Sequence, residues 1–468
     1  MTQEYLAATE QAQLVATRQI SARELTRHSL DVIARHNASL TAFVHVLARE
    51  AMERAMQLDN KLIRTGHPVG PLHGVPVAIK DEFAVRGVPT AMGTNAVTKP
   101  AVEDCEAVRR LREAGAVIIG ITAMPEFGQW PVTESATHGY TRNPWNQAFS
   151  TAGSSGGTAA AVASGMVAAG MGGDGGGSIR LPSAWCGLFG LKAQRGRVSA
   201  APNPTLWRGL GVVGALTRTV ADSALMYDVM ASHTTIDEYS AEPWAEPLSQ
   251  SLKRGVGKLR VLLAEKPATG GRYKLEAQTL EALHRVGRAL EAAGHYVEVG
   301  DLPEYKPGMA MVGQMAAGVS DELKQIDSVK LLEARTRQAV PLYRALSALF
   351  AESAERRGRE LASNMFSIFN RYDVLLTPTV PHPPVLVGRL EGLGILRSIG
   401  VALPMTAYTS IWNVLGNPAA AVPAGFTVGG LPLSVQLVGP PNSEPLLLQL
   451  AAQIEQALPW ADQHPPLD

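Results

Sequence analysis

The segment 150–182, STAGSSGGTAAAVASGMVAAGMGGDGGGSIRLP, constrains the fold and the chemistry of this chain more than any other feature. It holds two hydroxyl clusters, Ser154-Ser155 and Ser178, each set among glycines. Glycine lets the backbone approach a reacting atom closely, and a serine in such a loop is well placed to be a nucleophile beside backbone N–H donors. Residues 158–173 between the clusters are mostly Ala, Val, Met and Gly, which predicts a buried helix and not a flexible Gly/Ser linker.

Composition and charge exclude several kinds of partner. Lys plus Arg equals Asp plus Glu at 42 residues each, so we expect neither nucleic acid nor an anionic membrane surface as a partner. No uninterrupted apolar stretch of about 18 residues predicts a membrane span, and the polar N-terminus does not resemble a signal peptide. Two cysteines cannot build a disulfide framework, which favours a reducing, cytoplasmic location.

The succession of elements predicts an α/β fold with a mixed β-sheet core between helical layers. Ser21 and Glu24 form a capping box that starts a helix over 22–36, and an apolar run predicts a strand over 75–79 that ends at Lys80. Beyond them, we expect helices over 104–114 and 280–290, ended by Gly115 and Gly294, and strands over 116–121, 259–264, 296–299, 374–376 and 434–438. We expect a single domain over 1–468, with an N-terminal helical part at about 1–70, a central part at about 71–235, a polar linker at 237–257 and a closing part at about 259–468.

Lys80 has two interpretations from its local sequence. A lysine that closes a buried strand loses hydration, which favours the neutral amine, and a neutral amine can serve as a general base. Asp81 and Glu82 follow it directly and can instead hold it charged in an ordinary ion pair. The eleven histidines form no H-x-H or H-E-x-x-H motif, so a zinc hydrolase is not expected and lysine is the remaining base for the serines. A Ser–Lys arrangement is a known variant of the catalytic triad.

Several motifs together resemble the amidase signature family over about residues 5–455. The most informative are AGSSGG at 152–157, DGGGSIR at 174–180 and GVPVAIKD at 74–81. The match continues through MPEF at 124–127, RNPW at 142–145, CGL at 186–188, GLK at 190–192, RGRVS at 195–199, NP at 417–418, VPAGF at 422–426 and the segment 431–439. Together these motifs are far more specific than GSSGG alone.

The resemblance implies a Ser–Ser–Lys triad. Ser178 is then the nucleophile, Ser154, on a cis peptide bond, is the bridging serine, and Lys80 is the base. The oxyanion would be held by the N–H groups of Gly175, Gly176, Gly177 and Ser178, and water would hydrolyse the acyl-enzyme.

Two positions depart from the family pattern. Gly175 stands where the family commonly has Thr, and Ala152 stands where a Gly or Pro is common. The first change removes a hydroxyl and a Cβ beside the oxyanion site, so we expect a looser loop or a wider pocket. Neither change removes a group that the mechanism needs.

Other residues have both a functional and a structural interpretation. Asp174 and Arg180 flank Ser178, and a buried pair that holds the loop is favoured over substrate binding. Ser155 either supports Ser154 or Lys80, or caps the helix that follows. The apolar side chains that either line a substrate pocket or belong to the core are Met124, Phe127, Trp130, Tyr140, Trp145 and Trp207, of which Met124 and Phe127 belong to a motif that borders the family's active site. The Met-rich segment 309–315 predicts either a lid over the substrate or a core helix.

The sequence therefore predicts a cytoplasmic serine amidohydrolase that cleaves C–N bonds of uncharged amides with an apolar or aromatic part, with carbamates (urethanes) or esters as further substrates. We expect no metal, no organic cofactor, a small-molecule substrate as the partner, and a monomer or homodimer. One alternative is an α/β-hydrolase-type esterase, because residues 153–157 fit G-x-S-x-G with Ser155 as the nucleophile. A second is a phosphate-binding module with Gly-rich loops. A third is a glutaminase-type amidotransferase A subunit, which usually has Asp where this chain has Pro125.

Overall fold

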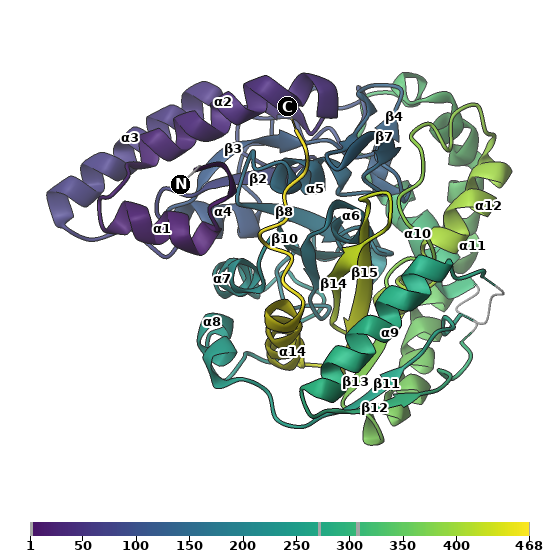
Figure 1. The fold of residues 1–468 in the computed structure, drawn as a ribbon. Coiled ribbons are helices and arrows are strands. Elements are labelled where there is room, and N and C mark those ends of the chain that lie inside the picture. Colours follow the sequence, from purple (N-terminus) through teal and green to yellow (C-terminus); the bar gives the residue numbers. More distant parts are fainter. Residues whose placement is uncertain (1–2, 270–272, 306–308, 468) are drawn as a thin grey trace.

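An eleven-stranded mixed sheet forms the centre of the molecule (Figure 1), in the order β1-β3-β2-β8-β10-β9-β14-β15-β13-β11-β12. The computed structural model describes residues 3–269, 273–305 and 309–467. The strands are β1 (Phe43–Val46), β2 (Pro76–Lys80), β3 (Val117–Thr122), β8 (Ala169–Asp174), β9 (Phe189–Lys192), β10 (Val212–Thr217), β11 (Arg260–Leu263), β12 (Tyr296–Val299), β13 (Val374–Pro378), β14 (Ala419–Phe426) and β15 (Pro432–Val438). Two small sheets pair β4 (Glu134–Ser135) with β5 (Gly139–Tyr140) and β6 (Arg142–Asn143) with β7 (Asn146–Ser150).

Helices cover both faces of the sheet, which confirms the predicted α/β class. They are α1 (Ala8–Ala16), α2 (Ala22–Leu40), α3 (Ala48–Thr65), α4 (Glu106–Glu113), α5 (Gly156–Ala163), α6 (Arg180–Cys186), α7 (Val220–Met230), α8 (Leu248–Ser251), α9 (Ala277–Ala292), α10 (Met309–Glu322), α11 (Ala334–Met365), α12 (Ile395–Met405), α13 (Ser410–Leu415) and α14 (Glu444–Ala457). One core cluster joins the sheet to α4, α7, α9 and α14, and a second joins it to α2, α3 and α5.

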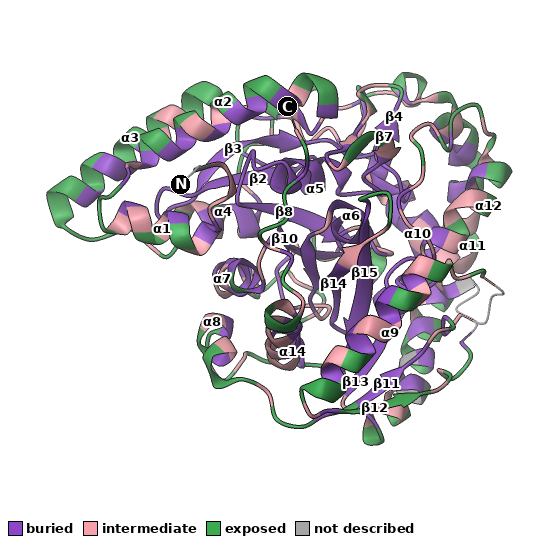
Figure 2. Cartoon of the chain, viewed as in Figure 1, coloured by how far each residue is buried: buried purple, intermediate pink, exposed green. Residues whose placement is uncertain are grey.

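Burial follows this layering. In Figure 2 the central strands are buried, whereas α2 and α3 expose one face and bury the other. Side chains that repeat at helical spacing make this stripe in α2, for example Leu25, Val32, Ile33 and Leu40. The helix begins with the predicted capping box, because Ser21 Oγ accepts the Glu24 N–H at 3.1 Å and Glu24 accepts the Ser21 N–H at 2.8 Å.

Parallel pairing of strands brings Lys80 and the Ser178 loop to the same edge of the sheet. Strand β2 pairs in parallel with both β3 and β8. The carboxyl ends of β2 and β8 therefore lie at the same edge, which is where open α/β sheets usually carry their sites. Lys80 ends β2, and Asp174 ends β8 four residues before Ser178.

The prediction of one buried helix over residues 158–173 is wrong in its second half. Helix α5 ends at Ala163, Gly165 takes a left-handed φ of 75°, and the chain then enters strand β8. The whole segment is buried, as predicted. Two glycines of β8 allow the strand to lie close to the serine loop and α5: a Cβ on Gly170 would lie 2.4 Å from Thr158 Cγ2, and a Cβ on Gly172 would lie 2.8 Å from Ser155 Oγ. The small apolar residues of segment 158–173 therefore do not distinguish a helix from a strand, and α5 packs very closely onto strand β8.

Most other element predictions agree with the structure within a few residues. Strand β12 has the predicted bounds, and β2, β3, β11, β13 and β15 overlap their predicted ranges. The N-terminal part, expected to be helical, also contributes β1, which pairs antiparallel with β3. The predicted linker at 237–257 contains the short helix α8. The Met-rich segment begins helix α10.

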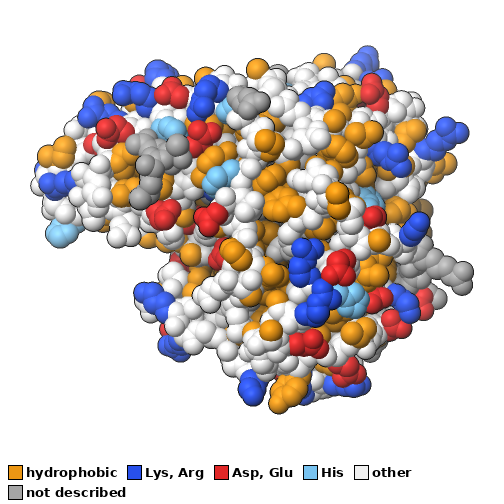
Figure 3. All heavy atoms as spheres, in the orientation of Figure 1, with side chains coloured by type: hydrophobic (Ala, Val, Ile, Leu, Met, Phe, Trp, Pro, Cys, Tyr) orange, Lys and Arg blue, Asp and Glu red, His pale blue; other side chains and the backbone are white. Residues whose placement is uncertain are grey.

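The surface has a mixed character. Figure 3 shows Lys and Arg side chains interspersed with Asp and Glu on the face displayed, without a large area of one sign. In the part of the chain that the structure describes, no helix combines the length and the apolar character that a membrane crossing requires.

Candidate active site

Lys80 contacts both a serine and a carboxylate. Its Nζ lies 2.9 Å from Ser154 Oγ and 2.7 Å from Glu82 Oε2. The lysine side chain is 1% exposed and that of Glu82 14%, so the ion pair is largely shielded from water. The structure thus shows the ion pair that the local sequence favoured, formed with Glu82, and also places the amine against Ser154. The role of Lys80 as a general base stays a prediction. Asp81 instead accepts backbone N–H groups from the loop 91–93.

The neighbouring serines have separate hydrogen-bond partners. The peptide bond between Gly153 and Ser154 is cis, and Ser154 Oγ meets Lys80. The Ser155 hydroxyl instead donates to the carbonyl oxygen of Gly173 in β8 at 3.2 Å, and its N–H donates to the carbonyl oxygen of Ser178 at 3.2 Å. Helix α5 receives no side-chain cap from Ser155. The Ser155 hydroxyl therefore bonds to the backbone of β8 and neither to Ser154 or Lys80 nor to the start of α5, and Ser155 fastens the serine loop to β8 and to the Ser178 loop.

The loop between β8 and α6 carries Ser178 and the glycine N–H groups. Gly177 donates its N–H to Asp174 Oδ1 at 2.7 Å, so this donor is already paired within the loop. Over the described residues, the N–H groups of Gly175, Gly176 and Ser178 have no acceptor within hydrogen-bond distance. Three of the four predicted oxyanion donors are thus open to a ligand, and Gly177 serves the loop itself.

Asp174 and Arg180 form a buried ion pair that holds this loop. Both side chains are 0% exposed, and the guanidinium lies 2.9 Å from Asp174 Oδ1 and 3.0 Å from Oδ2. Asp174 also accepts the backbone N–H of Ile179 at 3.1 Å. Burial alone would raise the pKa of Asp174, but the charge and hydrogen bonds of Arg180 hold it well below the usual range. The geometry agrees with the structural interpretation of this pair.

Residues distant in sequence complete the support of the loop. Asn413 in α13 donates to Asp174 Oδ1 at 2.9 Å and accepts from Arg180 at 2.6 Å. Thr409 Oγ1 donates to the carbonyl oxygen of Gly176 at 2.7 Å, and the Gln436 side chain accepts from Arg180 at 2.7 Å. Sequence reasoning missed these three residues. Their local sequence carries no chemical signal, because each acts only through a partner more than two hundred residues away.

An apolar cavity of about 150 Å³ opens beside Ser178. Its lining includes the open glycines of the loop and, from other parts of the chain, Gly128, Trp130, Leu181, Trp207, Leu210, Met311, Met315, Tyr343, Ile399, Ala402 and Leu403. None of its described lining residues is Asp, Glu, Lys, Arg or His. The Met-rich start of α10 therefore contributes to the wall of the cavity through Met311 and Met315.

The predicted pocket residues fall into two groups. Trp130 and Trp207 line the cavity. Met124 and Phe127 are both 1% exposed and are not among its described lining residues; Phe127 packs in a core cluster. Trp145 packs against Phe426 with a ring separation of 4.6 Å. The motif that carries Met124 and Phe127 borders the site through Gly128, where a Cβ would lie 3.1 Å from Ser154 Oγ.

The space left by Gly175 is occupied by an indole ring. A Cβ on Gly175 would lie 3.0 Å from Trp207 Cε3, and a Cβ on Gly318 in α10 would lie 2.8 Å from Trp207 Cα. Trp207 begins the short 3₁₀ turn Trp207–Gly209 and has a positive φ of 47°. The expected widening at Gly175 is thus filled by Trp207, which becomes part of the cavity wall.

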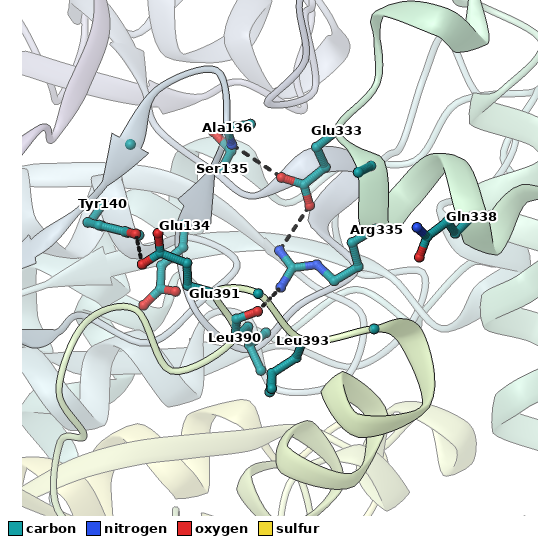
Figure 4. A pocket seen from close by; sticks show the side chains of 14 residues that line it. Glu134, Ser135, Ala136, Tyr140, Glu333, Arg335, Gln338, Leu390, Glu391 and Leu393 are labelled. Carbon is teal, nitrogen blue, oxygen red and sulfur yellow. Dashed lines mark hydrogen bonds and ion pairs between the residues drawn. The ribbon is translucent and has the colours of Figure 1, made fainter.

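A second and wider pocket has a volume of about 540 Å³ (Figure 4). It is lined by Glu134, Tyr140, Glu333, Arg335 and Glu391 among others, and by none of the predicted catalytic residues. Figure 4 shows Arg335 pointing between Glu333 and the carbonyl of Leu390, at 2.9 Å and 3.1 Å. The Arg335 guanidinium also lies 4.8 Å from the centre of the Trp130 ring, so it fixes that wall of the apolar cavity from outside.

The described residues 3–269, 273–305 and 309–467 contain no group of three or more His, Cys, Asp or Glu side chains arranged to hold a metal ion. The described lining of the cavity includes Ser178, Gly175 and Gly176, whereas Lys80 and Ser154, which contact each other, are not among its described lining residues. These groups can bind and polarise a carbonyl, attack it and move protons.

Comparisons with known proteins show the family to which the chain belongs. The family model described as Amidase matches residues 24–448. The chain is 41% identical over 457 residues to the Mycobacterium tuberculosis protein "Putative amidase AmiA2", covering 96% of this chain and 93% of that protein. Among solved structures, it is similar to a 6-aminohexanoate cyclic dimer hydrolase with a TM-score of 0.92 and 29% identity, over 99% of both chains. A bacterial aryl acylamidase of the amidase signature family matches with a TM-score of 0.86 and 28% identity, over 98% of this chain and 97% of the other.

The family model spans far more than half of the chain, and the matched relatives are covered over nearly their full length. The chain is therefore an enzyme that hydrolyses C–N bonds of amides, and it belongs to the amidase signature family.

Proposed function

We propose that this enzyme cleaves uncharged amides through an acyl-enzyme on Ser178, with Ser154 as the proton relay and Lys80 as the base. The observation that carries the proposal is the 2.9 Å contact between Lys80 Nζ and Ser154 Oγ, at the sheet edge where Ser178 faces an apolar cavity. The backbone contact between Ser155 and Ser178 supports it, because it ties the relay loop to the nucleophile loop.

The proposed reaction has two halves. Ser178 Oγ attacks the carbonyl carbon, its proton passes to Ser154 Oγ, and the proton of Ser154 passes to Lys80 Nζ. When the C–N bond breaks, the proton returns by the same route to the leaving nitrogen. Water then attacks the acyl-enzyme, again giving its proton to the relay, and the acid is released as Ser178 is restored.

The developing oxyanion needs donors that are free before substrate binds. Gly175, Gly176 and Ser178 meet this condition, since their N–H groups have no acceptor in the described part of the chain. Removing one donor of an oxyanion hole typically costs about 2.7–4 kcal/mol of barrier. The N–H of Gly177 instead donates to Asp174, which supports a role for Gly177 in holding the shape of the loop and not in binding the oxyanion.

The cavity supports a substrate with one small apolar or aromatic part. A cavity of about 150 Å³ lined by apolar side chains holds roughly one benzene ring. A charged substrate group would lose its hydration there without a charged partner among the described lining residues, which opposes a glutaminase reaction. The similar solved structures include an aryl acylamidase and a 6-aminohexanoate cyclic dimer hydrolase, and the first of these names supports a substrate with an aromatic part.

Carbamates and esters of similar size are proposed as secondary substrates, because they present the same planar carbonyl and a leaving group. The two cysteines, Cys105 and Cys186, are free and buried, which supports a reducing location such as the cytoplasm.

The test is a hydrolysis panel of acetanilide-type anilides, short aliphatic primary amides, aryl carbamates, aryl esters and glutamine. We expect the highest kcat/KM on anilides or apolar amides, none on glutamine, and no turnover by Ser178→Ala. Glutamine as the best substrate would contradict the substrate assignment. Amide cleavage that persists in a folded Ser178→Ala variant would contradict the mechanism.

A further inference from the structure

Glu82 is placed where it controls the catalytic lysine. Its carboxylate is the shortest contact of Lys80 Nζ at 2.7 Å, against 2.9 Å for Ser154 Oγ. The strand β2 ends at Lys80, and Glu82 reaches back from two residues beyond it. A lysine that is 1% exposed thus has one charged partner and one hydroxyl partner. The carboxylate and the hydroxyl together fix the direction of the amine.

The neighbouring strand leaves a place for this carboxylate. A Cβ on Gly173 of β8 would lie 2.4 Å from Glu82 Oε2, far closer than any real contact. Glycine at this position leaves the space in which the carboxylate lies against the strand and reaches Nζ. The site that holds Glu82 is therefore built by two elements, the end of β2 and the glycine of β8.

Further carboxyl groups surround the pair. Burial, followed by the charges of Glu82 and Asp321, raises the pKa of Glu322 at the end of α10 to about 7. Burial also raises the pKa of Asp81 to about 7, although backbone donors and Lys80 lower it. From β8 and the serine loop, the groups that meet Glu82 and Lys80 are Gly173 and Ser154, which carry no charge. Among these carboxyl groups, Glu82 is the one that contacts the amine.

We propose that Glu82 is a positioning residue for Lys80: its carboxylate holds Nζ against Ser154 and sets the pH range in which the amine can accept a proton. This inference rests on the proposed function, in which Lys80 is the base. A carboxylate at this distance favours the ammonium form, most strongly where water is excluded. Lys80 must lose that proton before Ser154 can pass one to it. Activity should therefore rise only at a higher pH than it would without Glu82.

The test is the pH dependence of kcat/KM for anilide hydrolysis in the wild type and in Glu82→Gln. The glutamine amide oxygen can still accept from Nζ, so the position is kept while the charge is lost. We expect the rising limb of the pH profile of kcat/KM to move to lower pH in Glu82→Gln by roughly 1–3 pH units, the usual effect of one close opposite charge. Glu82→Ala also loses the acceptor, and we expect its maximal kcat to fall by about 10²-fold, as for a misplaced catalytic group.

The matched control is Glu281→Gln, which breaks the Glu281–Arg288 pair. That pair has the same 2.7 Å separation, but its side chains are 63% and 60% exposed. Its profile should coincide with that of the wild type. Gly173→Ala displaces the Glu82 carboxylate without removing it, and we expect the limb to move in the same direction as in Glu82→Gln.

The outcomes separate this inference from the proposed function. The role of Glu82 is overturned if Glu82→Gln folds and the rising limb of its pH profile coincides with that of the wild type, even when its kcat is lower. If circular dichroism shows that Glu82→Gln does not fold, Gly173→Ala decides by the same criterion. Ser178→Ala must be inactive at every pH for the proposed function to stand, whichever way the Glu82 limb moves.

Discussion

Ser154 and Ser155 are identical neighbours in sequence, and they differ only in what their hydroxyls meet. Ser154 Oγ lies 2.9 Å from Lys80 Nζ, whereas the Ser155 hydroxyl is bound to the backbone of β8. The sequence indicates both serines as candidates but cannot assign different roles to them, because their hydrogen-bond partners depend on the position of β8 relative to the loop. The structural difference gives a direct test.

Ser154→Ala removes the proposed proton relay, and we expect kcat to fall by about 10²–10⁴-fold, the usual contribution of a positioned proton-transfer group. Ser155→Ala removes a buried hydrogen bond to Gly173 and should cost about 1 kcal/mol of unfolding free energy while most of the activity remains. Steady-state kinetics and urea unfolding of both variants measure these effects. The reverse ranking of kcat would point to Ser155 as the reacting serine.

Asp174→Asn should destabilise the molecule strongly, because it leaves the fully buried Arg180 guanidinium without its charge partner. Breaking a buried pair from one side typically costs about 3–5 kcal/mol. Asp373→Asn is the control, since it breaks the more exposed Arg260–Asp373 pair and should leave the unfolding free energy almost unchanged. Equal effects in chemical denaturation would show that the Asp174 pair does not hold the loop.

At the scale of elements, sequence patterns located strands and helices with caps or clear periodicity. The capping box at Ser21 and the apolar run before Lys80 both gave elements close to those observed. The pattern failed in segment 158–173, where small apolar residues fit a helix and a strand equally well. Close packing of α5 against the glycines of β8 favours the strand there, and this tertiary contact is not visible in the local sequence.

The pairing of Gly175 with Trp207 gives a prediction at this scale. Gly175→Thr places a Cβ about 3.0 Å from the indole, so the ring must shift in the cavity wall, and we expect kcat/KM for anilides to fall at least about tenfold. Trp207→Ala in the same chain removes the collision and should restore much of that loss. Kinetics of the two single variants and the double variant measure the coupling. Additive effects would mean that the two residues do not interact.

At the scale of the whole molecule, the sequence could predict the family and the amidase activity far better than the pocket. The residues of the proposed triad lie in short, distinctive motifs. The cavity wall is instead assembled from Trp130, Trp207, Met311, Tyr343 and Leu403, which belong to separate helices and loops. Each of these side chains is an ordinary apolar residue in its own segment. Only the packing of α10, α11 and α12 around the site makes them neighbours.

Buried acids give a prediction for the stability of the whole molecule. Burial raises the pKa of Glu126 to about 7, above the value of about 4.3 expected in the unfolded chain. Between these values the folded state binds more protons, so this residue makes stability fall as pH rises from about 4.3 to about 7, by about 1.4 kcal/mol for each unit of pKa difference. Glu126→Gln should reduce that decline. Urea unfolding at pH 5 and pH 7.5 tests it, and an unchanged pH dependence in the variant would refute the assignment.

The most direct test of the account is mass spectrometry of the chain, quenched in acid during hydrolysis of a slowly turned-over aryl ester and digested into peptides. The account predicts an acyl group on the peptide that contains Ser178, located on that serine by fragmentation and absent from Ser178→Ala. An acyl group on Ser155, or turnover of the same ester by Ser178→Ala, would contradict it.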